Sequence, residues 1–161
     1  MTAPAKAIVI AMASTIILAL IMQVFLFFPF YMTLVIETFN LANVAATDNY
    51  VKESFYDTII EDLRDRPVFS RRPRNEVQIH VRNSDNQSAI GDDNEFYYDE
   101  YGIDDHLKPY RQRGEPITIT IEARYPLEFQ WMGMTFRHDA GIPVSFEMTT
   151  IGLRYYKDLD L

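Results

Sequence analysis

The feature that most constrains this chain is a long stretch without charge near its start. No Asp, Glu, Lys or Arg occurs from Ala7 to Ile36. A helix of roughly 20 apolar residues is enough to cross a bilayer, and this stretch is longer. We therefore predict a transmembrane anchor over residues 1–36. That prediction excludes a plain soluble globule and leaves about 125 residues for one modest domain.

A cleavable signal peptide is the alternative interpretation of this stretch. Such signals combine a basic start, roughly 7–15 apolar residues and a small-residue cleavage site. Here Lys6 is the single basic residue before the run, and the run is about twice the length of a signal core. The small residues Ala42, Ala45 and Ala46 leave cleavage open. A retained anchor is nevertheless the better interpretation.

The basic residues near the anchor indicate its orientation. Lys6 lies before the span, and only Lys52 lies in the twenty residues after it. Because basic residues close to a span favour the cytoplasmic side, the N-terminus is expected in the cytoplasm. The sequence thus predicts a single-pass protein of the bacterial cell membrane with an extracytoplasmic C-terminal domain.

Two residues within the anchor are candidates for packing against other membrane helices. Gln23 could hydrogen-bond to a neighbouring helix, and the alternative is a polar residue that the membrane tolerates. Pro29 lacks a backbone donor and is expected to kink the helix. The aromatic cluster around it also fits the membrane interface, where aromatic rings are favoured.

Residues 37–66 are predicted to continue the anchor as an amphipathic helical stalk of about 28 residues, ending before Pro67. The segment has no Gly or Pro, and its apolar residues recur at steps that place them on one stripe. They are Leu41, Val44, Val51, Phe55, Ile59 and Leu63. We predict packing or partner contacts at Val44, Val51, Phe55 and Ile59. The chain's own sheet and another subunit are both open as the surface that this stripe contacts.

Residues 67–161 are predicted to form a β-rich domain. Residues 76–82 and 117–125 alternate apolar with polar side chains, and Pro126 is expected to limit pairing at the end of the second strand. Further candidates are a hairpin over residues 127–137 that turns at Gly133 and a strand over residues 144–150. Such alternation indicates an antiparallel sheet with one buried face. The predicted fold class is therefore α+β, with the long helix packed on a small antiparallel sheet.

An acidic insertion separates the first two predicted strands, over residues 83–115. It has no Lys or Arg up to Leu107 and contains the tyrosines Tyr97, Tyr98 and Tyr101. Loops of this length are usually functional or disordered, and tyrosine is common in protein interfaces. We predict surface contacts at these tyrosines. Calcium binding is a weaker alternative, because the acidic residues do not match the EF-hand spacing.

The one basic concentration has two interpretations. It consists of Arg64, Arg66, Arg71, Arg72 and Arg74. These side chains could touch anionic lipid if the stalk folds back onto the membrane. If the stalk projects outward, pairing with the acidic insertion is the better interpretation.

Composition and motifs argue against several functions. The 23 acidic and 15 basic residues disfavour a nucleic-acid surface, and the absence of cysteine excludes disulfides and thiolate metal sites. The histidines His80, His106 and His138 are too widely separated for the short ligand pairs of zinc sites. No nucleophile elbow, phosphate loop or dinucleotide fingerprint occurs. We predict a protein that is not an enzyme, with no metal, cofactor or small-molecule substrate.

The order of segments resembles that of type IV pilins and pseudopilins, and more closely that of the TadE-like pilus-assembly proteins. The resemblance lies in the small-residue segment 41–46, the alternating segment 117–121 with the Tyr125-Pro126-Leu127 that follows, and the late strand 144–150. The Gly and Glu of a prepilin-peptidase site are absent, since the first glycine is Gly91. The resemblance implies hydrophobic helices that bundle and β domains that face outward.

These observations predict a membrane-anchored structural or assembly subunit of a bacterial pilus, secretion or conjugation apparatus. Its expected partners are the lipid bilayer and other membrane helices, from copies of itself or from apparatus subunits. The alternatives are an accessory docking subunit of another membrane complex and a calcium- or ligand-binding extracytoplasmic domain.

Overall fold

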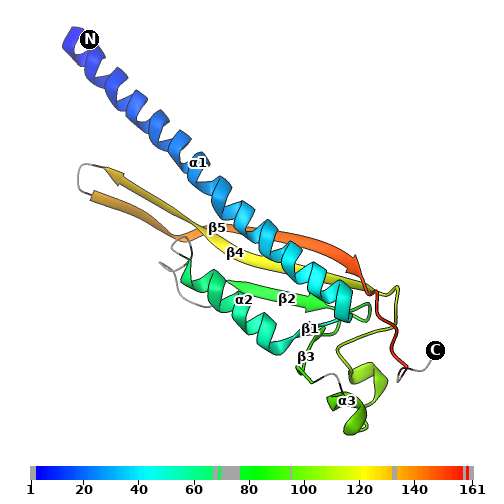
Figure 1. The fold of residues 1–161 in the computed structure, drawn as a ribbon. Helices are drawn as coiled ribbons and strands as arrows, with labels where there is room; N and C mark the ends of the chain where they lie inside the picture. The colour runs from blue at the N-terminus through cyan, green and yellow to red at the C-terminus, as the bar shows by residue number, and fades with distance from the viewer. Residues whose placement is uncertain are drawn as a thin grey trace.

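The computed structural model describes residues 3–66, 69, 77–94, 96–131, 134–157 and 159. Its fold is α+β, with one long apolar helix and a small antiparallel sheet (Figure 1). The elements are, in order, α1 (Ala3–Asp48), β1 (Val51–Lys52), α2 (Glu53–Asp65), β2 (Gln78–Arg82), β3 (Ile90–Gly91), α3 (Tyr97–Glu100), the 3₁₀ turn η2 (Asp105–Leu107), β4 (Pro116–Trp131) and β5 (Met134–Ile151).

The main sheet has the order β2-β4-β5, and both pairings are antiparallel. The predicted strands over residues 117–125 and 127–132 are one strand, β4, and the predicted return of the hairpin and the last strand are also one strand, β5. The predicted limit at Pro126 is wrong. The pairing of β4 with β5 continues past Pro126, with a register shift between Tyr125 and Leu127. This bulge accommodates a residue that has no backbone N–H to donate. The predicted turn at Gly133 lies outside the described residues.

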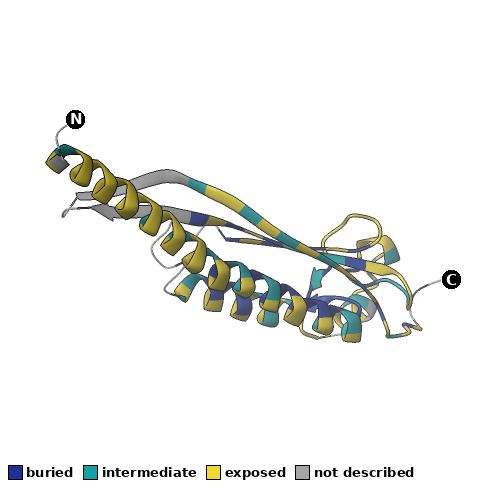
Figure 2. Cartoon of the chain, turned by 90° about the horizontal axis from the view of Figure 1, so that it is seen from above, coloured by how far each residue is buried: buried dark blue, intermediate teal, exposed yellow. Residues whose placement is uncertain are grey.

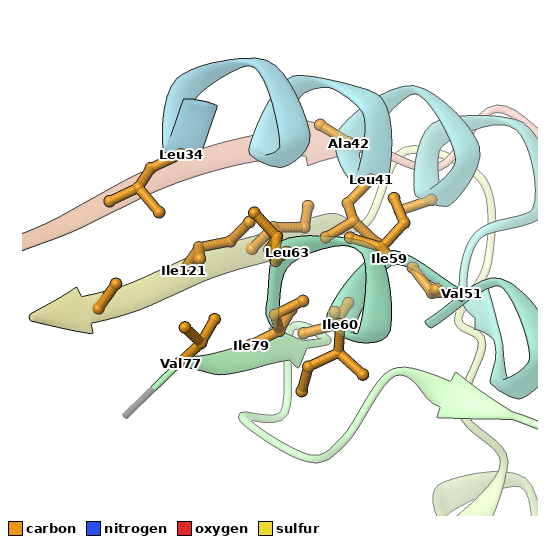
Figure 3. Close-up of a cluster of buried hydrophobic side chains, with 14 of the residues drawn as sticks. Leu34, Leu41, Ala42, Val51, Ile59, Ile60, Leu63, Val77, Ile79 and Ile121 are labelled. Carbon is orange, nitrogen blue, oxygen red and sulfur yellow. The ribbon is translucent and has the colours of Figure 1, made fainter. Parts of the chain in front are cut away.

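Helices α1 and α2 cover the same face of the sheet (Figures 1 and 2). The alternating residues of β2 and β4 fill the core, with Ile79 and Ile121 at paired positions of the two strands. Leu34 and Leu41 from α1 and Leu63 from α2 meet them from the helix layer (Figure 3). The predicted alternation is confirmed, because period-two patterning puts one set of side chains in the core and the other in solvent.

The prediction of one helix through residue 66 is wrong, because α1 ends at Asp48. Asn49 has a φ of 60°, a left-handed conformation that Asn tolerates better than most residues. After the short strand β1, the chain runs back across the sheet as α2 (Figure 1). The predicted stripe is therefore divided between two helices, and Leu41, Val51, Ile59 and Leu63 are all buried in the chain's own core.

The C-terminal segment completes the end of α1. The Leu153 amide donates to the Ala46 carbonyl (2.8 Å), and the Tyr156 hydroxyl donates to the Asp48 carbonyl (2.6 Å). These bonds satisfy carbonyls that a helix end leaves without partners.

The buried Asn49 side chain joins three segments. Its amide nitrogen donates to the carbonyls of Arg111 (2.8 Å) and Arg154 (2.7 Å), and its oxygen accepts from the Arg154 amide (2.9 Å). A Cβ at Gly152 would lie 2.5 Å from the Asn49 Cγ, so this approach requires glycine. Asn49 thus fixes the end of α1, the insertion and the C-terminal segment together.

We predict that Asn49→Ala lowers the free energy of unfolding by about 2–4 kcal/mol, because it leaves buried backbone groups unpaired and forces Ala into a left-handed conformation. Asn49→Gly should cost about 1 kcal/mol less, since Gly adopts the same φ freely. Denaturant unfolding of the full chain in one detergent measures both. The control Asn43→Ala, at an exposed position of α1, should be near neutral; equal stability of all three variants would contradict this role.

Candidate functional site

Helix α1 divides into two parts that face different surroundings. Between Ile8 and Phe28, the large apolar side chains that face the surroundings expose 46–70% of their area. Phe30 and Leu34, in contrast, are fully buried. Pro4–Asp48 is the one helix among the described residues that is long and apolar enough to cross a membrane. An uncovered apolar surface of this size is uncommon on a monomeric soluble protein and indicates an interaction site. We call residues 4–28 the exposed half of α1.

An aromatic cluster marks the point at which α1 leaves the domain. The Tyr125 ring contacts the rings of Phe27 (5.1 Å between centroids) and Phe30 (5.2 Å) edge-on. Its hydroxyl donates to the Gln23 carbonyl (3.1 Å) and lies 3.2 Å from Gln23 Oε1. Burial raises the pKa of Tyr125, so its hydroxyl stays a donor. The predicted partner-contact residue Gln23 therefore has a partner within its own chain.

The remaining predicted helix-packing residues lie in two places. Pro29 is an exposed residue of α1, and the helix continues through it without interruption. The Thr33 hydroxyl donates to the Pro29 carbonyl (2.9 Å). Val51 and Ile59 are buried, and Phe55 packs against the same core. Val44 is half-buried on α1. Their contacts with partners stay a prediction.

An ion pair ties the end of α2 to α1 just after the apolar run. Glu37, which is 7% exposed, pairs with Arg66 and also accepts from the Asn40 side chain (3.0 Å). Arg66 belongs to the predicted basic concentration, and its partner is a residue of α1 and not of the insertion. Arg71, Arg72 and Arg74 lie outside the described residues. This pair holds the end of α2 against α1.

The acidic insertion is folded around Arg111. The Arg111 side chain donates to the Asp85 carboxylate (2.7 Å), to Gln87 Oε1 (3.0 Å) and to the carbonyls of Lys108 (2.6 Å) and His106 (3.0 Å). A guanidinium can make so many bonds because it presents five donors in a rigid plane. Sequence reasoning missed this residue. The available signal was that Arg111 is the first arginine after the long stretch without Lys or Arg, three residues beyond Lys108.

The three predicted contact tyrosines have two different roles. Tyr98 is half-buried: its hydroxyl accepts from the Asp92 amide (2.7 Å), its ring contacts Tyr110, and burial raises the pKa of its hydroxyl. Tyr97 and Tyr101 are exposed, at 37% and 68%, and their rings lie 4.8 Å apart. Phe96, which sequence reasoning missed, is 67% exposed beside them in the chain. We call Phe96, Tyr97 and Tyr101 the aromatic surface.

Acidic residues of the insertion bond to the protein itself. The Asp93 carboxylate accepts from the Ser54 amide (3.1 Å) at the start of α2, and hydrogen bonds from the Ser54 hydroxyl and amide lower the pKa of Asp93. Asp105 pairs with the buried Lys108 (2.8 Å). No group of three or more His, Cys, Asp or Glu in the described part of the chain could hold a metal ion. His80 and His106 lie apart on the sheet and on η2, and the His138 side chain is outside the described residues.

The comparisons with known proteins add no relative. No protein-family model, no curated protein and no solved structure matches the chain. The resemblance to pilus-assembly proteins therefore stays a prediction that rests on the order of segments and their patterns.

We predict that Arg111→Gln loosens the insertion and leaves the sheet intact. Loss of the charged bonds should cost the insertion about 2 kcal/mol of local stability, roughly a 30-fold larger open population. Hydrogen exchange followed by mass spectrometry should therefore speed up in peptides from residues 83–110 and not in β4. Arg113→Gln, at an exposed neighbouring arginine, is the control. Unchanged exchange in the Arg111 variant would refute the role of this side chain.

Proposed function

We propose that this chain is a single-span, membrane-anchored structural subunit of a bacterial surface apparatus, similar in role to a minor pilin or TadE-like pilus-assembly protein. The observation that carries the proposal is the division of α1. One helix continues without interruption from an exposed apolar half into a half that forms the core of the domain. A helix built this way joins a folded domain directly to a bilayer.

The chemistry of the exposed half fits lipid. No charged residue occurs between Lys6 and Glu37, and the helix satisfies its backbone hydrogen bonds internally, as the hydrocarbon region requires. The exposed half has about 25 residues, or roughly 38 Å at 1.5 Å per residue, which suffices for a 30 Å hydrocarbon core. The basic residue before the span favours an N-terminus in the cytoplasm and a sheet outside.

The same half also carries a feature that favours helix association. The small residues Ala7, Ala11, Thr15 and Ala19 follow one another at intervals of four. Small residues at this spacing let two membrane helices approach closely, and packing of this kind drives association where lipid removes the hydrophobic effect. The anchor is therefore proposed to pack against equivalent or partner helices, with the sheet and insertion facing outward.

Single cysteines in the exposed half test the assembly, because the natural chain has none. In oxidised membranes, Ala11→Cys and Ala19→Cys should form disulfide-linked dimers or adducts with partner helices. Ala13→Cys and Ile17→Cys, on the opposite side of the helix, should form few. Uniform or absent cross-linking along the helix would contradict helix-mediated assembly. Full-length protein released from membranes by alkali would contradict the anchor itself.

A docking role in another membrane complex is the second candidate, and the aromatic surface favours it. Exposed aromatic side chains are enriched in protein interfaces and supply much of their binding energy. The surrounding carboxylates suit a basic partner. In this role, the insertion would contact a different protein and the anchor would only hold the domain near the membrane.

The paired change Tyr97→Ser with Tyr101→Ser tests the docking role. It should leave the thermal stability of the full chain nearly unchanged, since both rings are exposed, but release the chain from a complex assembled in its native membranes. The size of that complex after gentle detergent extraction is the measurement. Tyr155→Ser, at another exposed tyrosine, is the control. A complex of unchanged size would argue against docking through this surface.

A further inference from the structure

The face of the sheet that lies away from the helices carries an open cleft of about 460 Å³. Helices α1 and α2 cover the other face (Figure 2), where Ile79 and Val81 are buried. Successive residues of a strand alternate between the two faces of a sheet, and directly paired residues share a face. His80 and Arg82 therefore point away from the helices. Residues of β2, β4, β5 and the turn after β2 line the cleft.

Hydrogen-bond donors gather at one end of the cleft. Arg82 is the last residue of β2, and Asn83, Ser84 and Asn86 follow it in the turn. The Arg82 guanidinium donates to Asn86 Oδ1 (2.8 Å) and pairs with no carboxylate in the described part of the chain. A guanidinium presents five donors in a fork that matches a carboxylate, so Arg82 has donors left for a ligand.

Asn83 adds a buried donor without a partner. The residue is 5% exposed, and its Oδ1 accepts from the backbone amides of Asp85 (3.1 Å) and Gln87 (3.0 Å). Because a backbone amide donates only to an acceptor, these two bonds identify the oxygen of the side chain and therefore also its nitrogen. Asn83 Nδ2 is buried and has no hydrogen-bond partner among the residues that the structure describes. An unpaired buried donor costs free energy, which an acceptor on a ligand would recover.

Two carboxylates lie at the other end of the cleft. Glu147 is paired across the sheet with Thr120, and the Thr120 hydroxyl donates to Glu147 Oε2 (3.1 Å). Glu122 lies on the same face, two residues farther along β4 from the turn. These negative charges repel a simple anion, whereas a ligand with one negative and one positive end is attracted at both ends. The cleft therefore favours a molecule that is charged at both ends.

The separation of the two ends sets the length of the ligand. Arg82 and Glu147 are two strands and two residues apart, so their Cα atoms lie about 12 Å apart at ~4.8 Å per strand and ~3.3 Å per residue. The same spacings place the Cα atoms of Arg82 and Glu122 about 14 Å apart. Both side chains cover part of that distance. A free amino acid is too short for the remainder, whereas a peptide of two or three residues spans about 7–11 Å.

We propose that this cleft binds a peptide of two or three residues by both of its termini. The C-terminal carboxylate accepts hydrogen bonds from Arg82 and Asn83, and the N-terminal ammonium pairs with Glu122 and Glu147. Capture of a peptide terminus is a recurring mode of recognition, and charge-assisted hydrogen bonds are the stronger kind. The volume of the cleft is within the roughly 300–1,000 Å³ of small-molecule sites. Because the cleft lies on the sheet, the inference does not depend on the proposed membrane span.

Trialanine with free termini is the probe. It is added to the full chain in detergent, and binding is followed by saturation-transfer difference NMR, with protein-free micelles as the blank. N-acetyl-trialanine lacks the ammonium and trialanine amide lacks the carboxylate, so each should bind about tenfold more weakly than trialanine. Free alanine should also bind more weakly, because it cannot reach both ends.

Three outcomes with the unaltered chain would overturn the proposal. The first is the absence of saturation transfer to trialanine beyond the blank. The second is equal binding of trialanine and its two blocked forms, since the termini would then not be recognised. The third is displacement of trialanine by acetate or by maltose at the same concentration, which would show a site for anions or for carbohydrate.

Variants assign the two ends of the cleft. Asn83→Asp keeps the oxygen that accepts from the turn and replaces the nitrogen by a carboxylate oxygen, so it should abolish binding of trialanine. Thermal melting verifies that this variant is folded. Arg82→Gln, at an exposed position, tests the same end without a change in the core and should weaken binding about tenfold.

The paired change Glu122→Gln with Glu147→Gln should weaken binding of trialanine about tenfold and leave N-acetyl-trialanine unaffected, since that peptide has no ammonium. The control Arg113→Gln removes an exposed arginine that does not line the cleft and should change neither. Binding that Arg82→Gln does not weaken, or that Arg113→Gln weakens equally, would refute the assignment of this site.

Discussion

A three-stranded sheet can cover only part of a 46-residue helix, and this limit governs the rest of the structure. The core begins at Phe30 and continues to the end of α1, about five turns of helix. Most of the large apolar side chains before that point are exposed, although Gln23 and Phe27 contact Tyr125. Because these side chains are not buried within the chain, they form the surface that we propose lipid or another protein covers. The domain and its environment thus share one continuous element of secondary structure.

The division of α1 into an exposed half and a half in the core also accounts for the many hydrogen bonds at its C-terminal end. If the exposed half spans a bilayer, as proposed, the other end of α1 must be held firmly in the domain. Segments distant in sequence hold it there. The Asn49 side chain binds the carbonyls of Arg111 and Arg154, and the C-terminal segment supplies donors to the last carbonyls of α1. The parallel pairing of β1 with β3 adds the insertion to the same end. The insertion therefore helps to hold the end of α1 in the domain.

Local patterns in the sequence were sufficient to predict the long helix and two of the strands. The uncharged run predicts α1, and the alternation over residues 76–82 and 117–125 predicts β2 and the first part of β4, with their buried faces. The end of α1 could not be found in the same way, because Asn49 is an ordinary residue for a helix until its contacts with Arg111 and Arg154 are known. Those contacts join residues more than sixty positions apart.

The candidate site follows the same rule. The exposed apolar half and the exposed Tyr97 and Tyr101 could be predicted from the sequence, because a long uncharged run and tyrosines within an acidic insertion are local patterns. Tyr98 has the same local composition but is half-buried, since Asp92 and Tyr110 lie against it. Arg111 and the bond between Tyr125 and Gln23 depend on how the chain folds back, and no spacing in the sequence encodes them. The prediction at Pro126 was wrong because a bulge in the ladder accommodates a residue without a backbone donor.

The uninterrupted passage of α1 from its exposed half into the core has a mechanical consequence. A linker of glycines would let the domain swivel on its anchor, but the first glycine of the chain is Gly91, far beyond the helix. Any rotation of the anchor about its own axis is therefore transmitted to the sheet as an equal rotation. In the proposed membrane assembly, the side on which the anchors meet would therefore decide which surface of the domain a neighbour encounters.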